Sequence, residues 1–451
     1  MTDNTPFHRE NATNTRHGSA EKTIHCISLG CPKNRVDTER MLGDLGTMRP
    51  VDDIGQAKIV LINTCGFIAP AVEESTRVIL EAAEQIKELS PRPLLVVAGC
   101  LVSRYGSELR TAIPEVDLWL AVEEERELRA RLRPMADFEL PAQDLPTLRA
   151  LSTKPVFAYL KIGEGCNHRC HFCTIPSIRG PRRSMGLDAV VREAETILDQ
   201  GVRELILVAQ DLTAYGRDLG LRHGLETLLG RLARLSDLHW LRLMYLYPAG
   251  LTPRLLRFMA ELGPPLLPYF DIPVQHAHPD ILRAMGRPFA KDPRHTVERV
   301  REHFPDAALR TSVIVGYPGE RPHHFQRLYD FVTETRFHHL GVFGFCPEAG
   351  TRAASLPGQV GTKTKAKRRD RLMELQAGIS ADILAQCQDQ EMDVFVERPS
   401  PEWPGLFEGR VWFQAPEVDG MTYVSGVDIQ PGDLVRAAIV ETKTYDLVAL
   451  R

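Results

Sequence analysis

The sequence contains no apolar run long enough to cross a bilayer. The longest run, residues 94–102, is far shorter than the about 20 residues that a membrane-spanning helix requires. The first 21 residues are polar and lack the apolar core of a secretory signal. We therefore expect a soluble, cytoplasmic protein that does not work in a membrane, with residues 1–21 as a disordered polar tail.

The sequence also lacks an excess of charge of either sign. Its 55 Lys and Arg residues nearly balance its 59 Asp and Glu residues, so the overall charge gives no sign of a nucleic-acid surface. Cysteine is sparse, with nine in 451 residues, and the number is odd. Without a secretion signal, this favours reduced thiols that serve as metal ligands or catalysts over a disulfide framework.

The first of three regions, residues 22–138, alternates β-rich runs with helical stretches. This rhythm predicts a domain built on an open parallel α/β sheet. Cys31, Cys65 and Cys100 each follow a strand-like run. Because the carboxyl ends of parallel strands share one edge of such a sheet, we expect these three thiols to converge.

A Pro-rich linker, residues 139–150, leads to the second region, residues 151–380. Six strand-like runs recur there with helical patterns between most of them, which predicts a partial TIM-type (β/α)6 barrel. Reactive residues of such barrels lie on loops at the C-terminal ends of the strands. The loop after the first strand carries three more cysteines. Residues 363–371 are basic and predict an exposed connecting helix.

The third region, residues 381–451, is rich in β-formers and turns and predicts a small antiparallel β-barrel. It holds thirteen Asp and Glu residues against five Lys and Arg residues, a net charge of −8. Such a domain repels phosphate backbones and attracts basic proteins, which argues against direct nucleic-acid binding.

The three cysteines on the barrel loop leave one position of a metal open. A structural zinc site normally closes four ligands, whereas sets of thiolates also bind iron-sulfur clusters. His168 and His171 could complete a zinc site locally, although two histidines on so short a loop would strain its tetrahedral geometry. Cys26, Cys346 and Cys387 fit the interpretation as small buried apolar residues.

The spacing Cys-x3-Cys-x2-Cys, with Phe172 before the last cysteine, resembles the radical S-adenosylmethionine (SAM) enzymes. The continuation CTIPSIRG and the earlier motifs SLGCPKNRVDTE, INTCGFI and AGCL narrow the resemblance to methylthiotransferases, over residues 22–451. The resemblance implies an N-terminal cluster domain, a radical SAM barrel and a C-terminal TRAM domain. It also implies two 4Fe-4S clusters, the SAM-binding one on Cys166, Cys170 and Cys173 and the other on Cys31, Cys65 and Cys100.

Members of this family modify either an adenosine of tRNA or an aspartate of the twelfth small-subunit ribosomal protein. The stretches GCPKN and FDIPVQHAHPDILRAMGR resemble the protein-modifying form. The tRNA enzymes typically have Gln-Met after the first cysteine and Gln-Ser-Gly at the positions of residues 275–277. The acidic third region also favours a basic protein as substrate.

An aliphatic C–H bond, as at the β-carbon of aspartate, offers no acidic proton and no leaving group, so a radical cofactor must supply the reactivity. The resemblance implies that an electron donor feeds the first cluster, which cleaves SAM to methionine and a 5′-deoxyadenosyl radical that abstracts the hydrogen. It implies that sulfur arrives through the second cluster and that another SAM supplies the methyl group.

Further candidates come from their place in the family motifs. Phe172 is a candidate for packing on the adenine of SAM, with an ordinary core aromatic as the alternative. Candidates for SAM contacts after the second and fifth barrel strands are Gln210, Asp211, Ile314 and Gly316, with turn geometry as the alternative. Gln275 and His276 are substrate candidates, with a structural histidine as the alternative. We assign no function to the histidine pairs at 323–324 and 338–339.

Two departures from the family pattern stand out. Met185 occupies a position where members usually have arginine, and Arg182 or Arg183 could compensate. Cys346 occupies a position where serine is common, and we interpret it as an isosteric replacement. Two other functions remain open: a tRNA methylthiotransferase, and a zinc-bound scaffold that associates with ribosomes and performs no chemistry.

Overall fold

A computed structural model describes the chain except for residues 1–21, 47, 139, 141–148, 154–155 and 288–291. The expected tail and most of the expected linker lie outside the described residues. The chain forms two compact units, Met1–Ser152 with Thr174–Pro181, and Thr153–Cys173 with Arg182–Arg451. In the part of the chain that is described, no helix has the length and apolar character to span a membrane.

The first unit is the predicted open parallel α/β sheet, with strand order β2-β1-β3-β4-β5. Its strands are β1 (Thr23–Ser28), β2 (Arg49–Pro50), β3 (Ile59–Thr64), β4 (Leu94–Gly99) and β5 (Leu118–Leu120). Its α-helices are α1 (Pro32–Leu45), α2 (Ala69–Lys87), α3 (Cys100–Ala112), α4 (Leu128–Leu132) and α5 (Ile175–Arg179).

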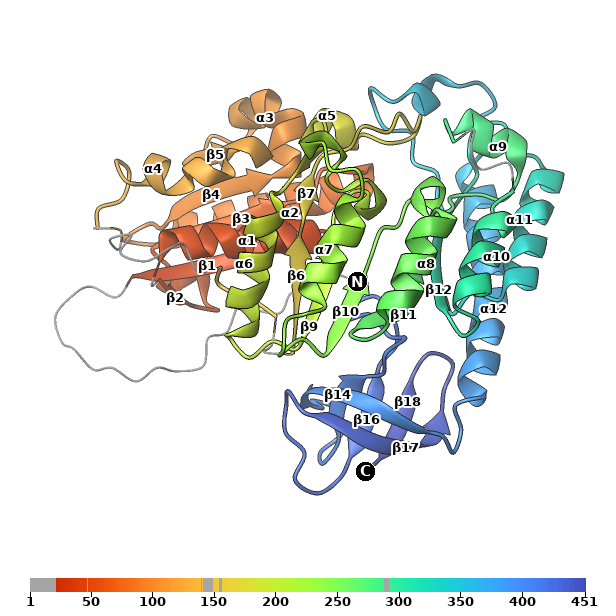
Figure 1. Cartoon of the computed structure of the whole chain (residues 1–451). Helices are drawn as coiled ribbons and strands as arrows, with labels where there is room; N and C mark the ends of the chain where they lie inside the picture. The colour runs from red at the N-terminus through yellow and green to blue at the C-terminus, as the bar shows by residue number, and fades with distance from the viewer. Residues whose placement is uncertain (1–21, 47, 139, 141–148, 154–155, 288–291) are drawn as a thin grey trace. The chain divides into compact units, whose positions relative to one another are not determined.

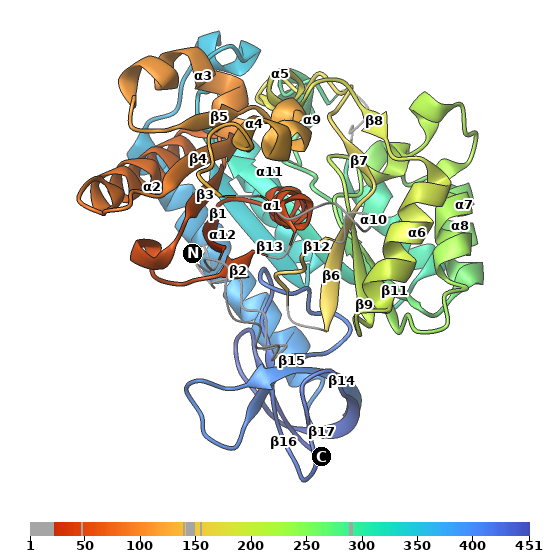
Figure 2. The same ribbon diagram turned by 90° about the vertical axis from the view of Figure 1, so that its left-hand side faces the viewer.

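Helices cover both faces of this sheet, as Figure 2 shows. Val60 and Ile62 of β3 belong to a core that includes Ile79 of α2, while Ile59 and Leu61 belong to another that includes Leu45 of α1. All six residues of β3 are buried, as expected for a parallel strand covered on both sides. The central strands therefore lie between two apolar cores.

The second unit contains the predicted partial barrel, an open parallel sheet of six strands in the order β13-β12-β11-β10-β9-β6. Figure 1 labels the strands of this sheet from β6 to β12. The strands are β6 (Phe157–Lys161), β9 (Glu204–Val208), β10 (Trp240–Leu243), β11 (Leu266–Asp271), β12 (Ala308–Val315) and β13 (His339–Gly344). The helices that follow them are α6 (Leu187–Leu198), α7 (Gly224–Leu232), α8 (Pro253–Leu262), α9 (Pro279–Ala284), α10 (Arg294–His303), α11 (Pro322–Thr335) and α12 (Thr362–Ala385). A small hairpin of β7 (Gly163–Glu164) and β8 (Arg183–Ser184) flanks the cysteine loop.

The basic stretch at 363–371 lies on α12, but the expectation of a fully exposed helix is wrong for two of its side chains. Arg368 is buried and forms a 3.0 Å ion pair with Glu320. Lys365 donates a 2.7 Å hydrogen bond to the carbonyl of Phe345. The charge pattern did not show these partners because they lie far away in sequence.

The C-terminal domain is a closed barrel in the order β14-β15-β16-β18-β17. Its strands are β14 (Glu391–Pro399), β15 (Phe407–Arg410), β16 (Thr422–Ser425), β17 (Leu434–Thr442) and β18 (Leu447–Leu450). All pairs are antiparallel, as predicted, except β16 and β18. A closed ring of five strands cannot alternate in direction throughout, so one parallel pair is unavoidable.

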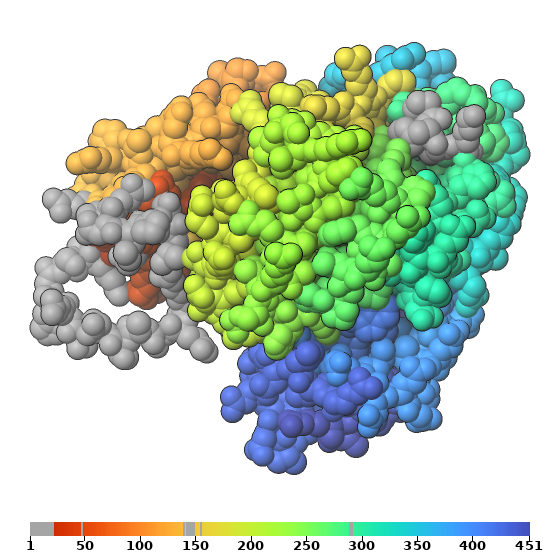
Figure 3. All heavy atoms as spheres, in the orientation of Figure 1, coloured from red at the N-terminus to blue at the C-terminus, as the bar shows by residue number. Residues whose placement is uncertain are grey.

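A segment of this domain, residues 410–419, contacts the six-stranded sheet and is called the plug segment below. Arg410 forms a 2.6 Å ion pair with Glu204, the first residue of β9, and the Trp412 carbonyl accepts a 2.8 Å hydrogen bond from Arg242 of β10. Figure 3 shows the C-terminal domain, in blue, packed against the second unit's sheet-bearing part, in green.

The plug segment also reaches the remaining strands of the sheet. Asp419 accepts a 2.7 Å hydrogen bond from Tyr269 of β11 and pairs with Arg310 of β12. Tyr159 of β6 donates to Glu417, and His339 of β13 donates to the Phe413 carbonyl. One side chain from each of the six strands thus bonds to this segment.

Candidate functional site

The structure brings Cys31, Cys65 and Cys100 to one edge of the first sheet. Cys31 precedes α1 and lies just after β1, Cys65 directly follows β3, and Cys100 begins α3 after β4. Since β1, β3 and β4 are neighbours in the sheet, the three loops leave it side by side. The α/β pattern predicted this convergence from the strand ends alone.

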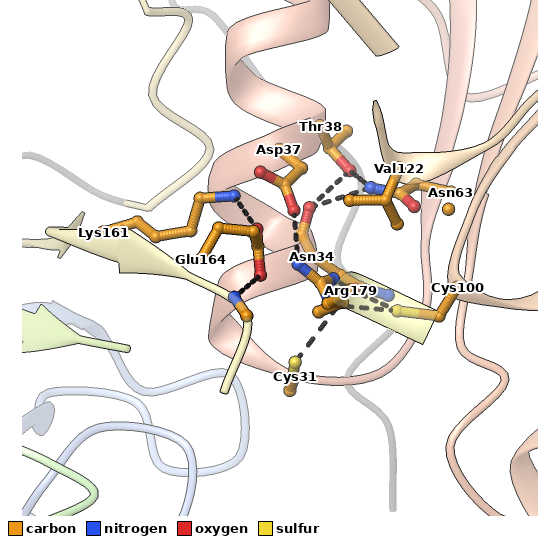
Figure 4. A network of polar contacts seen from close by, with 12 residues as sticks. Cys31, Asn34, Asp37, Thr38, Asn63, Cys100, Val122, Lys161, Glu164 and Arg179 are labelled. Carbon is orange, nitrogen blue, oxygen red and sulfur yellow. Dashed lines mark hydrogen bonds and ion pairs between the residues drawn. The ribbon is translucent and has the colours of Figure 1, made fainter. Parts of the chain in front are cut away.

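Asn34 lies close to Cys31 and Cys100 in this thiol site, as Figure 4 shows. Its Nδ2 donates 2.9 Å hydrogen bonds to the carbonyls of Leu29 and Thr64, which follow β1 and end β3. These bonds fix the amide so that Oδ1 lies 4.0 Å from the Cys31 sulfur and 3.7 Å from the Cys100 sulfur. Asn34 is fully buried, so this orientation is set by the protein and not by solvent.

Two glycines permit the close approach of the loops. Gly30 has φ +94°, and a Cβ there would lie 2.8 Å from the Cβ of Cys65. Gly99 has φ +103°, and a Cβ there would overlap the Asn63 side chain. Any other residue would be strained at these two positions and would push the cysteine loops apart.

Burial and one cation dominate the electrostatics of the thiols. Burial raises the pKa of Cys100 to about 12 and that of Cys65 to about 11, and the neighbouring thiols act in the same direction. Burial also acts on Cys31, but the charges of Lys33 and Arg179 outweigh it and lower the pKa of that thiol. The charge of Arg179 acts to lower the pKa of all three thiols, against the effect of burial, so it influences every cysteine of the site.

The second trio lies on the loop after β6 and β7. The Cys173 amide donates a 3.1 Å hydrogen bond to the Cys170 carbonyl, which folds this loop into a turn. All three thiols are partly buried, and burial raises the pKa of Cys166.

The two histidines of this loop anchor it to the barrel. His168 lies 2.7 Å from a carboxylate oxygen of Asp211 and stacks on Tyr247, with ring centroids 3.7 Å apart. His171 donates through Nδ1 to the Ala284 carbonyl, and its Nε2 lies 3.4 Å from the Arg352 guanidinium. Both nitrogens of His171 are therefore engaged, which argues against a zinc site completed by both histidines.

The donor geometry of the cysteine trios argues against a single metal ion at either site. Within the described residues, the one group of three ligand atoms that lie within 4.8 Å of one another is His278, His323 and His324. Neither cysteine trio is that compact, whereas a single zinc ion needs such proximity. Each trio supplies three thiols, and thiolates are the ligands that iron-sulfur clusters take.

The histidine group has a simpler explanation. His278 accepts the Asp280 amide at 3.2 Å through Nδ1 at the start of α9, and His324 accepts the Arg321 amide at 3.0 Å at the start of α11. A neutral ring that accepts through Nδ1 carries its proton on Nε2, the reverse of what a metal at Nε2 requires. These histidines act as helix caps.

Polar side chains of a second kind gather at the C-terminal ends of β6 and β9. Glu164 accepts 2.7 Å hydrogen bonds from Lys161 and from Gln210. Burial alone would raise the pKa of Asp211, but hydrogen bonds from His168 and Thr213 hold it below its usual range. A small pocket beside them is lined by Glu164, Arg182, Ser184, Asp211 and Tyr215.

The other predicted residues lie in different surroundings. Phe172 and Ile314 pack against one apolar cluster that contains Met285 and Tyr317, which is the behaviour of core residues. Gly316 has φ +73°, and a Cβ there would overlap the Lys365 side chain.

Gln275 and His276 differ in exposure. Gln275 adopts φ +71° and forms a parallel bridge with β12, with its side chain half-buried. His276 is completely buried, and its Nδ1 accepts the His278 amide at 2.9 Å. Complete burial favours the structural alternative for His276 over a substrate contact.

Sequence reasoning missed Arg179 and the anchoring role of His168. It also left open the departure at Met185. There the backbone is engaged on both sides, with its amide donating to Ile162 and its carbonyl accepting from Tyr215. Arg182, proposed as a substitute, lies 3.3 Å from Asp211. The family motif CTIPSIRG contains Arg179, but nothing local in it points to a thiol far away in sequence.

An open six-stranded barrel with a three-cysteine loop after its first strand defines a radical SAM protein. The radical SAM superfamily model matches residues 160–332. Residues 23–121 match an uncharacterized protein family, UPF0004, and residues 390–450 match the TRAM domain. A solved radical S-adenosylmethionine methyltransferase, TsrM from Kitasatospora setae, aligns with TM-score 0.53 and 14% identity over 86% of this chain and 81% of its own, which shows the fold alone.

Relatives over nearly the whole chain give the family. A protein of Nitratidesulfovibrio vulgaris (strain DP4), named ribosomal protein uS12 methylthiotransferase RimO, is 58% identical over 95% of this chain and 99% of its own length. The protein of that name in Lawsonia intracellularis (strain PHE/MN1-00) is 52% identical over 94% and 97%. The chain belongs to the RimO family of methylthiotransferases.

Proposed function

We propose that this enzyme places a methylthio group on the β-carbon of an aspartate in ribosomal protein uS12. The observation that carries the proposal is the 58% identity, over 95% of the chain, to enzymes named for that activity. The two cysteine trios support it, because methylthiolation of an aliphatic carbon needs both radical generation and a source of sulfur.

We infer that Cys166, Cys170 and Cys173 hold the SAM-binding 4Fe-4S cluster and that Cys31, Cys65 and Cys100 hold the second one. When bound, these groups supply the one-electron and radical chemistry that an unactivated C–H bond requires. Cys100 is buried and the other five thiols are partly buried, so the loops limit the contact of both sites with solvent. Because SAM cleavage consumes one electron, an electron donor is a necessary partner.

The polar residues after β6 and β9 are the proposed SAM contacts. Gln210 and Asp211 already have fixed orientations, since one is bonded to Glu164 and the other to His168 and Thr213. Gly316 is proposed for a backbone contact beside the Lys365 side chain, which lies where a Cβ would be, and Phe172 and Ile314 would border the cofactor through the apolar cluster that they pack against. Gln275 is the better of the two substrate candidates because His276 has no exposed surface.

The charge of the C-terminal domain supports a basic protein substrate over RNA. Two of the less exposed acids are paired with arginines, Glu397 with Arg410 and Glu408 with Arg398. The exposed acids of this domain include Glu391, Asp393, Glu402, Asp428 and Glu441. The negative charge therefore faces solvent, where it favours encounter with a basic ribosomal protein in the cytoplasm.

The test is mass spectrometry of uS12 from cells that carry the wild-type gene, no gene, Cys166→Ala or Cys387→Ala. Cys387 is a buried cysteine outside both trios, so its variant controls for the loss of any thiol. We expect a methylthio-aspartate peptide with the wild type and Cys387→Ala, and none with the deletion or Cys166→Ala. An unmodified uS12 in every strain, with methylthio-adenosine in tRNA that depends on this gene, would show that the substrate is tRNA instead.

A further inference from the structure

Residues 174–181 interrupt the second unit and belong to the first, although Cys173 and Arg182 on either side do not. We call this segment the strap. Thr174 donates a 3.1 Å hydrogen bond to the Phe67 carbonyl, two residues after Cys65. Ile178 and Arg179 are buried. The strap is thus fastened to the loops that carry the first unit's thiols.

Arg179, the last residue of α5, makes three directed contacts in this thiol site (Figure 4). Its Nε lies 3.2 Å from the Cys100 sulfur, its Nη1 lies 3.2 Å from Asp37, and its Nη2 bonds to Asn34 Oδ1. Its side chain is 2% exposed. Each nitrogen of the guanidinium therefore has a partner, and the planar group is fixed with Nε toward sulfur.

A cation bonded to a ligand sulfur affects the metal group on that sulfur. Hydrogen bonds to sulfur and nearby positive charge stabilise the reduced, more negative state of an iron-sulfur cluster and so raise its reduction potential. The charge of Asp37 acts in the opposite direction, from the far side of the guanidinium. Removing the charge of Arg179 and removing the charge of Asp37 should therefore shift the reduction potential in opposite directions.

We propose that Arg179 is a positioning residue that sets the reduction potential of the cluster on Cys31, Cys65 and Cys100, through its N–H bond to Cys100. This inference rests on the proposed cluster assignment. The strap follows directly after Cys173, a ligand of the proposed SAM-binding cluster. It supplies the cation that sets the reduction potential of the second cluster.

The experiment uses the full chain with Cys166, Cys170 and Cys173 all replaced by alanine, so that only the second cluster can form. After anaerobic reconstitution, iron and sulfide are counted and the midpoint potential is measured by a titration followed by electron paramagnetic resonance. Variants in this background are Arg179→Met, Arg179→Lys and Asp37→Asn. Arg104→Met is the matched control, because Arg104 is a nearby arginine that donates to the Gly66 and Phe67 carbonyls beside Cys65.

We expect a lower potential for Arg179→Met, a smaller decrease for Arg179→Lys, a higher potential for Asp37→Asn, and no shift for Arg104→Met. Opposite shifts of the potential in Arg179→Met and Asp37→Asn are the decisive result. If Arg179 had a purely structural role, both variants would lose iron and their potentials would not move in opposite directions. If Arg179→Met does not bind iron, the potentials of Arg179→Lys and Asp37→Asn still test the inference. Intact clusters with unchanged potentials would overturn the inference, whereas absence of a cluster in the parent protein would overturn the cluster assignment itself.

Discussion

At the scale of single residues, histidine has three different roles within the second unit. His168 bridges the cysteine loop to Asp211, His278 and His324 cap helices, and His276 is sealed in the interior. These roles follow from the partner of each ring nitrogen and from burial, so the residue type alone could not have separated them.

His276 gives the protein a pH dependence of stability. Burial, with the charges of His278, His324 and Arg368, lowers its pKa from 6.5 to about 3. Between those values the unfolded chain binds a proton that the folded chain does not, so stability falls as the pH drops below about 6.5. A pKa shift is worth about 1.4 kcal/mol per unit.

We expect His276→Gln to reduce the loss of unfolding free energy between pH 7.0 and 5.5 by about 1 kcal/mol. Urea unfolding of the cluster-free protein at the two pH values measures it. His239→Gln is the control for the loss of a histidine, because His239 is exposed. Equal slopes in all three proteins would mean that His276 opens to solvent.

At the scale of elements, the plug segment is the contact that depends most on buried charge. Glu204 and Arg242 are fully buried, and Arg410 is nearly so. Burial alone would raise the pKa of Glu204, but the charges of Arg410 and Arg242 hold it below its usual range. Removing one partner from such a set leaves an uncompensated charge in the interior.

Arg410→Met should therefore lower the unfolding free energy of the second unit by about 3–5 kcal/mol. Arg436→Met, in the same small barrel, should cost at most about 1 kcal/mol, because its ion pairs with Glu391 and Asp393 are exposed. Thermal unfolding, followed by a probe on the six-stranded barrel, compares the stabilities of the two variants. Similar melting temperatures for the two variants would show that the plug segment contributes little.

The element scale also shows how far the sequence could be interpreted. The strands, the cysteines at their ends and the six-stranded barrel were predictable, because periodicity and turns are local signals. Arg179 beside Cys100, or Asp419 beside Tyr269, could not be found this way, since their partners are distant along the chain. The parallel pair of β16 and β18 was missed because the strand count, and not any local pattern, requires it.

At the scale of the whole molecule, the exposed acids of the C-terminal domain should act on substrate encounter. We expect the triple variant Glu402→Gln/Asp428→Asn/Glu441→Gln to raise the KM for uS12 several-fold at low salt, with kcat unchanged, because long-range charge changes association more than chemistry. Steady-state assays at low and high salt measure this, and the difference should shrink at high salt.

The matched control is Glu81→Gln/Glu84→Gln/Glu88→Gln on and just after α2, which removes the same charge from exposed positions of the first unit. We expect it to leave the KM near the wild-type value. An equal rise in both triple variants would assign the effect to net charge and not to the C-terminal domain.

The plug segment also bears on the order of events during synthesis. It follows the barrel along the chain and so leaves the ribosome after it, yet Glu204, Arg242 and Arg310 of the barrel each take one partner from it. Domains usually fold as they emerge, beginning from the N-terminus. Until the plug segment has emerged, Glu204 and Arg242 have each other in the interior of the barrel but lack its further partners. A premature stop codon upstream of residue 410 would yield a six-stranded barrel without the plug segment. Such a barrel would not reach its stable fold, and cellular proteases would degrade it before it binds iron.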